Sequence, residues 1–102
     1  MPYIDKYHRI TIDQHLDEIV KCIHSHDNAQ WDGDLNYAMS YLVAKTFAPC
    51  GKWRYHFIAR ALGAFEAAKL EFYRRVAGPY EDKAIAKNGD IQPYANANEL
   101  KG

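Results

Sequence analysis

Hydrophobic side chains recur every three to four residues along most of the chain, which is the spacing of amphipathic α-helices. The pattern predicts a first helix that Thr11 caps, with Gln14 completing a capping box, and that ends near His24 to His26. Its apolar positions are Ile12, Leu16, Ile19, Val20 and Ile23. We expect residues 1–10, which precede this cap, to form an N-terminal arm.

A second amphipathic helix is predicted after a turn at residues 31–34, where Asp32 or Asp34 serves as the N-cap. Its apolar positions are Leu35, Ala38, Met39, Leu42, Val43 and Phe47, and Tyr37 and Tyr41 share one flank. Pro49, Cys50 and Gly51 are expected to end it.

The stretch from Arg54 to Gly78 predicts a third helix, about 37 Å long. At 100° per residue its apolar side chains form a core-facing stripe. The members of this stripe are Ile58, Ala61, Leu62, Phe65, Phe72, Tyr73 and Val76. We expect Gly78-Pro79 to interrupt the helix, and a short fourth helix to run from Pro79 to a C-cap at Asn88-Gly89. Residues 90–102 are predicted to be a loose tail.

Together these elements predict one all-α domain over residues 1–102, a small bundle of three to four helices. The third helix is longer than its neighbours can cover, which favours a homo-oligomer. Its small-residue line, Ala59, Gly63 and Ala67, would let a partner backbone approach closely. The alternative is that this line packs on the first helix of the same chain.

Composition narrows the classes of partner. The chain has 102 residues, with 13 Lys plus Arg and 13 Asp plus Glu, so its net charge is zero. A general binder of long nucleic acid or of an anionic membrane needs surplus positive charge, so neither partner is expected. No apolar run approaches a membrane span or a signal segment, and we therefore expect a cytoplasmic protein with Cys22 and Cys50 reduced. Eight tyrosines suit interfaces and the stacking of planar ligands.

One lysine stands out on the third helix. Lys69 falls in the middle of the apolar stripe, Glu66 is placed to pair with it at i,i+3, and Tyr73 lies one turn further on. On a functional interpretation Lys69 faces a cavity and binds a phosphate or carboxylate. On a structural one, Lys69 and Glu66 form an ion pair at the edge of the core, with the lysine head in water.

Cations and aromatic residues also gather at both ends of this helix. Lys52, Trp53, Arg54 and Tyr55 stand at its start, where backbone N–H groups favour anions, and Arg74-Arg75 stands near its end. We predict a small anionic, nucleotide-like ligand that contacts two sets of side chains. Arg54, Lys69, Arg74 and Arg75 would bind phosphate, Glu66 would orient Lys69, and Trp53, Tyr55 or Tyr73 would stack on a base. The structural alternative is that Trp53 anchors the helix start and the arginines complement the helix dipole.

No catalytic or metal motif is evident. Cys22, His24, His26 and Asp27 do not converge at zinc spacing. Residues 32–36 begin like a calcium loop, but Tyr37 and Val43 occupy its glycine and glutamate positions. Five histidines and two cysteines leave a nucleophile assembled in space open. We expect no cofactor, no metal and no enzymatic activity.

Three segments carry a family resemblance: MPYIDK, GDLNYAMSYL and AKLEFYRRVAGPYEDK. They resemble a small uncharacterised family, labelled as a domain of unknown function, that bacteriophages and bacteria encode. The resemblance covers most of the chain and implies no established activity and no catalytic residues.

Two analogies suggest functions. In size, helicity and aromatic-cation content the chain is similar to phage proteins that sequester the nucleotide signals of bacterial immunity. The GDLNYAMSYL helix resembles one helix of all-α nucleotide pyrophosphatases, but Asp34, Glu66 and Glu71 do not form the paired carboxylate motifs of their magnesium site.

The leading hypothesis is a phage-type, non-catalytic sponge that sequesters a nucleotide-derived immune signal in the cytoplasm of a host cell. The alternatives are an interaction module that inhibits a host protein and, further, a metal-dependent nucleotide pyrophosphatase.

Overall fold

The computed structural model describes residues 2–95, and all regular structure in that range is helical. The elements are α1 (Lys6–His24), a 3₁₀ turn (Asn28–Gln30), α2 (Trp31–Phe47), α3 (Tyr55–Phe72), a π-helical segment (Tyr73–Ala77), α4 (Gly78–Asn88) and α5 (Gln92–Ala95). The chain divides into two compact units, residues 1–67 and 68–102, with the boundary inside α3. The all-α prediction is confirmed.

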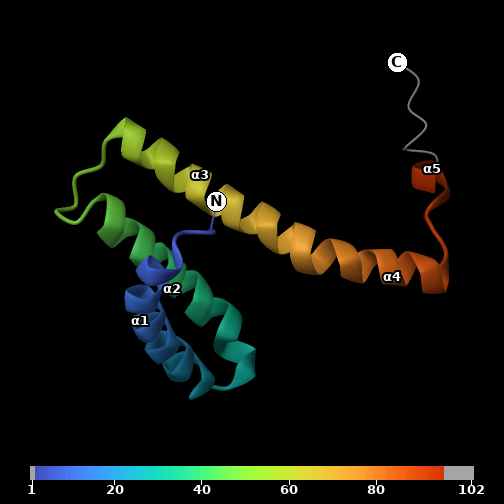
Figure 1. Ribbon diagram of the computed structural model, residues 1–102, viewed down its shortest axis with the longest axis horizontal. Helices are drawn as coiled ribbons and strands as arrows, with labels where there is room; N and C mark the ends of the chain where they lie inside the picture. The colour runs from blue at the N-terminus through green and yellow to red at the C-terminus, as the bar shows by residue number, and fades with distance from the viewer. Residues whose placement is uncertain (1, 96–102) are drawn as a thin grey trace. The chain divides into compact units, whose positions relative to one another are not determined.

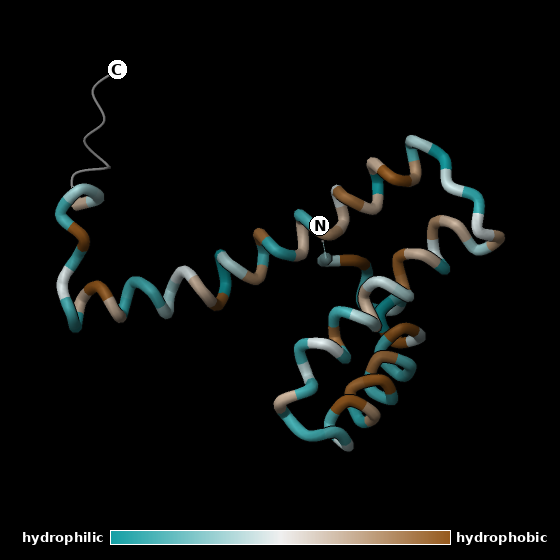
Figure 2. Tube along the Cα trace, turned by 180° about the vertical axis from the view of Figure 1, so that it is seen from behind, coloured by the Kyte–Doolittle hydropathy of each residue, from teal (hydrophilic) through white to brown (hydrophobic). Residues whose placement is uncertain are grey.

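Within the first unit, α1 and α2 lie side by side (Figures 1 and 2). The end of α2 meets the start of α3 where the rings of Phe47 and Phe57 lie 6.2 Å apart, with the Arg60 guanidinium over both. Hydrophobic positions recur along both helices of the α1–α2 pair (Figure 2). Neither helix nevertheless contains a buried side chain, and Ala48 and Ala61 are the buried residues of the described chain.

The predicted start of the first helix was wrong. Asp5 caps α1 by accepting a hydrogen bond from the Tyr7 backbone N–H at 2.9 Å, so the expected arm is helical from Lys6 onward. Thr11 lies inside the helix, where its hydroxyl donates to the His8 carbonyl at 3.1 Å. Both residue types are good caps, and the earlier one begins the helix.

The predicted turn at residues 31–34 was also wrong. Helix α2 begins at Trp31, directly after the 3₁₀ turn, and Gln30 precedes it. Asp32 and Asp34 occupy the first helical turn, where a negative charge complements the exposed N–H groups. The predicted ends were confirmed, since α1 ends at His24 and α2 ends at Phe47, just before Pro49.

Gly78-Pro79 does not interrupt the helix. The chain passes from α3 through the π-helical segment into α4, and the Gly78 N–H bonds the Tyr73 carbonyl five residues back. In an α-helix the ring of Pro79 would press on the Arg75 carbonyl, and a single wide turn relieves that clash. The close approach favours glycine, since a Cβ at position 78 would lie 3.2 Å from the Tyr73 carbonyl oxygen.

The end of α4 follows the sequence prediction. Helix α4 ends at Asn88, and Gly89 adopts a φ of 91°, which favours glycine, while its N–H bonds the Ile85 carbonyl at 2.8 Å. Of the predicted loose tail, residues 92–95 form the single turn α5, and residues 96–102 lie outside the described residues.

The small-residue line on α3 is open within the first unit. Nothing outside its own helix backbone lies within 4 Å of the position a Cβ would take at Gly63. The alternative in which this line packs on α1 is therefore wrong. The neighbouring stripe residues Ile58, Leu62 and Phe65 are likewise exposed, so this part of the stripe does not face a core in the first unit.

Candidate functional site

A groove of about 430 Å³ lies between α1 and α2. We call it the α1–α2 groove. It is lined by Ile19, Cys22 and Ile23 of α1, by Asp34, Tyr37, Ala38, Tyr41 and Leu42 of α2, and by His26. All of these residues belong to the first compact unit.

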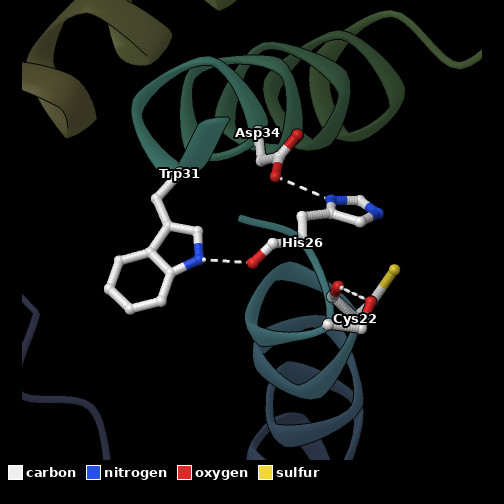
Figure 3. Close-up of polar contacts among 5 residues, drawn as sticks. Cys22, His26, Trp31 and Asp34 are labelled. Atoms are coloured by element: carbon white, nitrogen blue, oxygen red, sulfur yellow. Dashed lines mark hydrogen bonds and ion pairs between the residues drawn. The ribbon is translucent and has the colours of Figure 1, made fainter. Parts of the chain in front are cut away.

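Polar contacts link the chain after α1 to the start of α2 beside this groove (Figure 3). The Nδ1 of His26 lies 2.8 Å from Oδ2 of Asp34, and the indole N–H of Trp31 donates to the His26 carbonyl at 3.3 Å. The ring of His24 lies 5.2 Å from that of Trp31. These contacts tie the end of α1 to the first turn of α2, which fixes the register of the two helices at the groove.

An aromatic rim flanks the groove. Tyr37 and Tyr41 stand one turn apart on α2, with ring centroids separated by 6.1 Å, and both are largely exposed. Beside them the walls are aliphatic, with Cys22 as an exposed free thiol. Such a surface suits apolar and aromatic side chains better than a phosphate, because it offers a phosphate few donors.

The described residues do not form a metal site. Within residues 2–95, no group of three or more His, Cys, Asp or Glu side chains is placed to hold a metal ion. This includes the residues around Cys22 and His26 and the Asp32–Asn36 segment. Nor does any helix of that range combine the length and apolar content needed to cross a membrane.

The predicted ligand site is divided between the two units. Trp53, Arg54 and Tyr55 belong to the first unit and are exposed. Trp53 lines a second hollow, of about 370 Å³, together with Ile58, Ala61, Leu62 and Phe65. The carbonyl of Arg54 accepts from the Phe57 and Ile58 N–H groups, both at 3.0 Å, so Arg54 directly precedes the first turn of α3.

The remaining predicted residues lie in the last turns of α3 and the segment after it. Glu66 and Lys69 are exposed positions of α3. Arg74 binds the Glu71 carboxylate through both Nε, at 3.4 Å, and Nη2. Arg75 is exposed. Whether these side chains join those of Trp53 and Arg54 around one ligand stays a prediction.

Tyr73 has an acidic partner of its own in the second unit. Its hydroxyl donates to Oε2 of Glu81 at 2.8 Å. This hydrogen bond, followed by the negative charge of the same carboxylate, raises the pKa of Tyr73 above its ordinary value of 10.0. The same hydrogen bond orients the ring of Tyr73, on which the predicted ligand base would stack.

Comparison with known proteins identifies the family. A family model described as a domain of unknown function, DUF6899, matches residues 1–91. The chain belongs to the DUF6899 family. The predicted resemblance to an uncharacterised family is thus confirmed, and the DUF6899 description assigns no activity to its members. No curated protein and no solved structure matches the chain.

Sequence reasoning missed the main groove of this DUF6899 chain. Helical periodicity places Tyr37 and Tyr41 on one flank of the second helix, but it does not show that this flank lies beside the residues around His26. The signal that was available is the spacing itself, since Cys22 and His26 on one side and Tyr37 and Tyr41 on the other are i,i+4 pairs. Tyr37 and Tyr41 thus share one face of α2, and His26 follows the end of α1 close to Cys22.

Proposed function

We propose that this DUF6899 protein is a helical interaction module, a non-catalytic protein that binds other protein surfaces through the apolar faces of α1 and α2. One observation carries the proposal: neither helix contains a buried side chain. Their apolar residues are instead either half-buried or exposed, and the large hydrophobic side chains among the exposed ones stand 39 % or more exposed.

The energetic consequence supports binding. Ordering each residue of a helix costs about 1–2 kcal/mol of conformational entropy. Fully burying an aliphatic or aromatic side chain contributes about 1.5–3 kcal/mol, and an exposed one contributes little of this. Helices that bury so little within their own chain need additional burial, which a protein partner supplies.

The test is the mass of the native particle. The tagged chain, expressed at its natural level in the organism that encodes it, is separated by size-exclusion chromatography with light scattering, and the purified chain is treated in the same way. We expect a particle heavier than the 11.8 kDa of one chain in at least one of these settings. A cooperatively folded 11.8 kDa monomer in both settings would refute the proposal.

Sequestration of a nucleotide-derived signal is a second candidate, and the start of α3 favours it. There Trp53 lines an apolar hollow beside the exposed Arg54 and Tyr55, a combination suited to a stacked base and its phosphate. This candidate function ranks second because two other predicted ligand residues, Tyr73 and Arg74, already bond the carboxylates of Glu81 and Glu71. A ligand would have to displace those carboxylates.

Isothermal titration calorimetry with cyclic dinucleotides and ADP-ribose tests this candidate. We expect a Kd tighter than about 10 μM, or about −6.8 kcal/mol, if the site is used. Arg54→Ala should then weaken binding, whereas Lys87→Ala, which removes an exposed cation from α4, should leave it unchanged. Absence of any binding at that level removes the candidate.

A further inference from the structure

Helix α2 has the residue pattern of a helix that is surrounded. At 100° per residue, Tyr41, Leu42 and Phe47 point in directions roughly 100–140° apart, so no side of the helix is free of large apolar groups. Helices of this kind are normally covered on every side. Yet α2 has no buried side chain in the described chain.

Two sides of α2 have neighbours within the first unit. Helix α1 covers the side that carries the half-buried Ala38, and Phe57 meets Phe47 at the far end. The third side carries Tyr37 and Tyr41, which are 69 % and 52 % exposed. The uncovered side of α2 is therefore the side that bears the aromatic rim of the α1–α2 groove.

We infer that a second copy of this chain covers the α1–α2 groove, so that two α1–α2 pairs form a two-fold symmetric four-helix dimer. This inference rests on the proposed interaction function and names the partner. A two-fold axis requires a surface that fits itself. Here Tyr37 and Tyr41 line a hollow of about 430 Å³ and are also exposed, so that in a symmetric pair the tyrosines of each copy fill the hollow of the other.

The exposed tyrosines supply part of the area that a stable dimer needs. Tyr37, Tyr41 and Leu42 are 69 %, 52 % and 43 % exposed and offer roughly 350 Å² together, taking about 200–250 Å² per tyrosine. A standard interface buries about 800 Å² per partner, so these three side chains supply a little under half of it, and neighbouring parts of α1 and α2 supply the rest.

Charge does not oppose the pairing of identical surfaces. Helix α1 carries three basic residues, Lys6, Arg9 and Lys21, and three acidic residues, Asp13, Asp17 and Glu18. The whole chain has zero net charge, so two copies meet without net repulsion. A second copy is also present wherever the chain itself is, which makes folding and dimerisation one step.

The two cysteines provide a test without any substitution. Cys22 lies in the groove and Cys50 lies in the loop between α2 and α3, and both thiols are exposed in the single chain. Alkylation is followed by mass spectrometry at chain concentrations from 1 to 200 μM. Relative to Cys50, we expect Cys22 to react roughly fivefold more slowly at the highest concentration, because mass action buries it in the dimer.

A substitution gives the independent readout. Tyr37→Glu places a charge at the centre of the proposed interface and should convert a two-chain particle into a single chain. Tyr7→Glu changes a tyrosine that is 82 % exposed and lies outside the groove, and should leave the dimer intact. If Tyr37→Glu fails to fold, the protection of Cys22 in the unchanged protein still decides.

The outcomes separate this inference from the proposed function. A dimer in which Cys22 reacts as fast as Cys50 at every concentration overturns the inference, since the copies then meet through another face. A purified monomer that enters a heavier particle in its own cells also overturns it, while the interaction function stands. A monomer in both settings removes both.

Discussion

Replacing Gly63 with alanine in the middle of α3 tests whether the small-residue line is open or covered. Position 63 has ordinary helical surroundings, and a Cβ there would meet nothing within 4 Å. Alanine is more favourable than glycine inside a helix by about 0.8–1.0 kcal/mol. With no packing cost against it, Gly63→Ala should stabilise the protein by about 1 kcal/mol.

That gain is measurable. It corresponds to about a fivefold higher ratio of folded to unfolded chain, or a rise in Tm of about 4–8 °C for a domain of this size. Urea unfolding followed by the helical circular dichroism signal measures it, at one fixed chain concentration because the proposed dimerisation would make stability concentration-dependent. Ala64→Gly, the reverse change at the next exposed position, should lose a similar amount.

A loss of stability at Gly63 would refute this reasoning. Such a result, with Ala64→Gly behaving as expected, would mean that another backbone lies against the Ala59–Gly63–Ala67 line and that the added methyl group pushes it away. The intermolecular contact would then be on α3, and the α1–α2 groove would no longer be the leading interface.

Three further outcomes are expected, each from a single contact. Gly78→Ala should give no gain in the same urea assay, because its Cβ would lie 3.2 Å from the Tyr73 carbonyl oxygen and the strain offsets roughly 1 kcal/mol of helix propensity. Asp5→Ala should cost about 1 kcal/mol as a lost N-cap, whereas Thr11→Ala should stay within about 0.5 kcal/mol of the parent chain. Glu81→Gln should lower the pKa of Tyr73 toward 10.0, and NMR of ring-labelled tyrosine measures that pKa. Because the pKa is raised in the folded protein, the Tyr73–Glu81 pair stabilises the fold below pH 10.0. This stabilisation is lost as the pH rises through the pKa of the folded protein.

Element ends were predictable where a residue breaks the helix locally. Pro49 stops α2 and Gly89 stops α4 because one lacks an N–H and the other takes up a positive φ, whatever surrounds them. The start of α1 was missed because Asp5 and Thr11 carry the same capping signal, and the sequence alone does not rank them. A Gly-Pro pair is compatible either with the end of a helix or with a π-helical turn inside it. At Gly78-Pro79 the helix continues through the π-helical segment Tyr73–Ala77.

The candidate site was harder to predict because it depends on two helices meeting. The predicted ligand residues from Trp53 to Arg75 follow from residue type and from spacing along a single predicted helix. The α1–α2 groove exists because the His26–Asp34 contact and the Trp31 indole fix one helix against the next. Periodicity within a single helix does not report such a contact, so the groove had to come from the structure.

The all-round apolar pattern of α2 is nevertheless a sequence signal that favours the proposed assembly. The amphipathic interpretation assumed that each helix turns one apolar face to a core of its own chain, and it assigned Tyr37 and Tyr41 to a flank. Helix α2 carries large apolar side chains in three directions, so covering it on all sides would contribute a favourable free energy of apolar burial. Gly63 on α3 has no side chain, so leaving its face open to water costs little free energy. The proposed self-association is thus argued from the all-round apolar pattern of α2, and the surface that α1 leaves uncovered on this helix is the rim at Tyr37 and Tyr41.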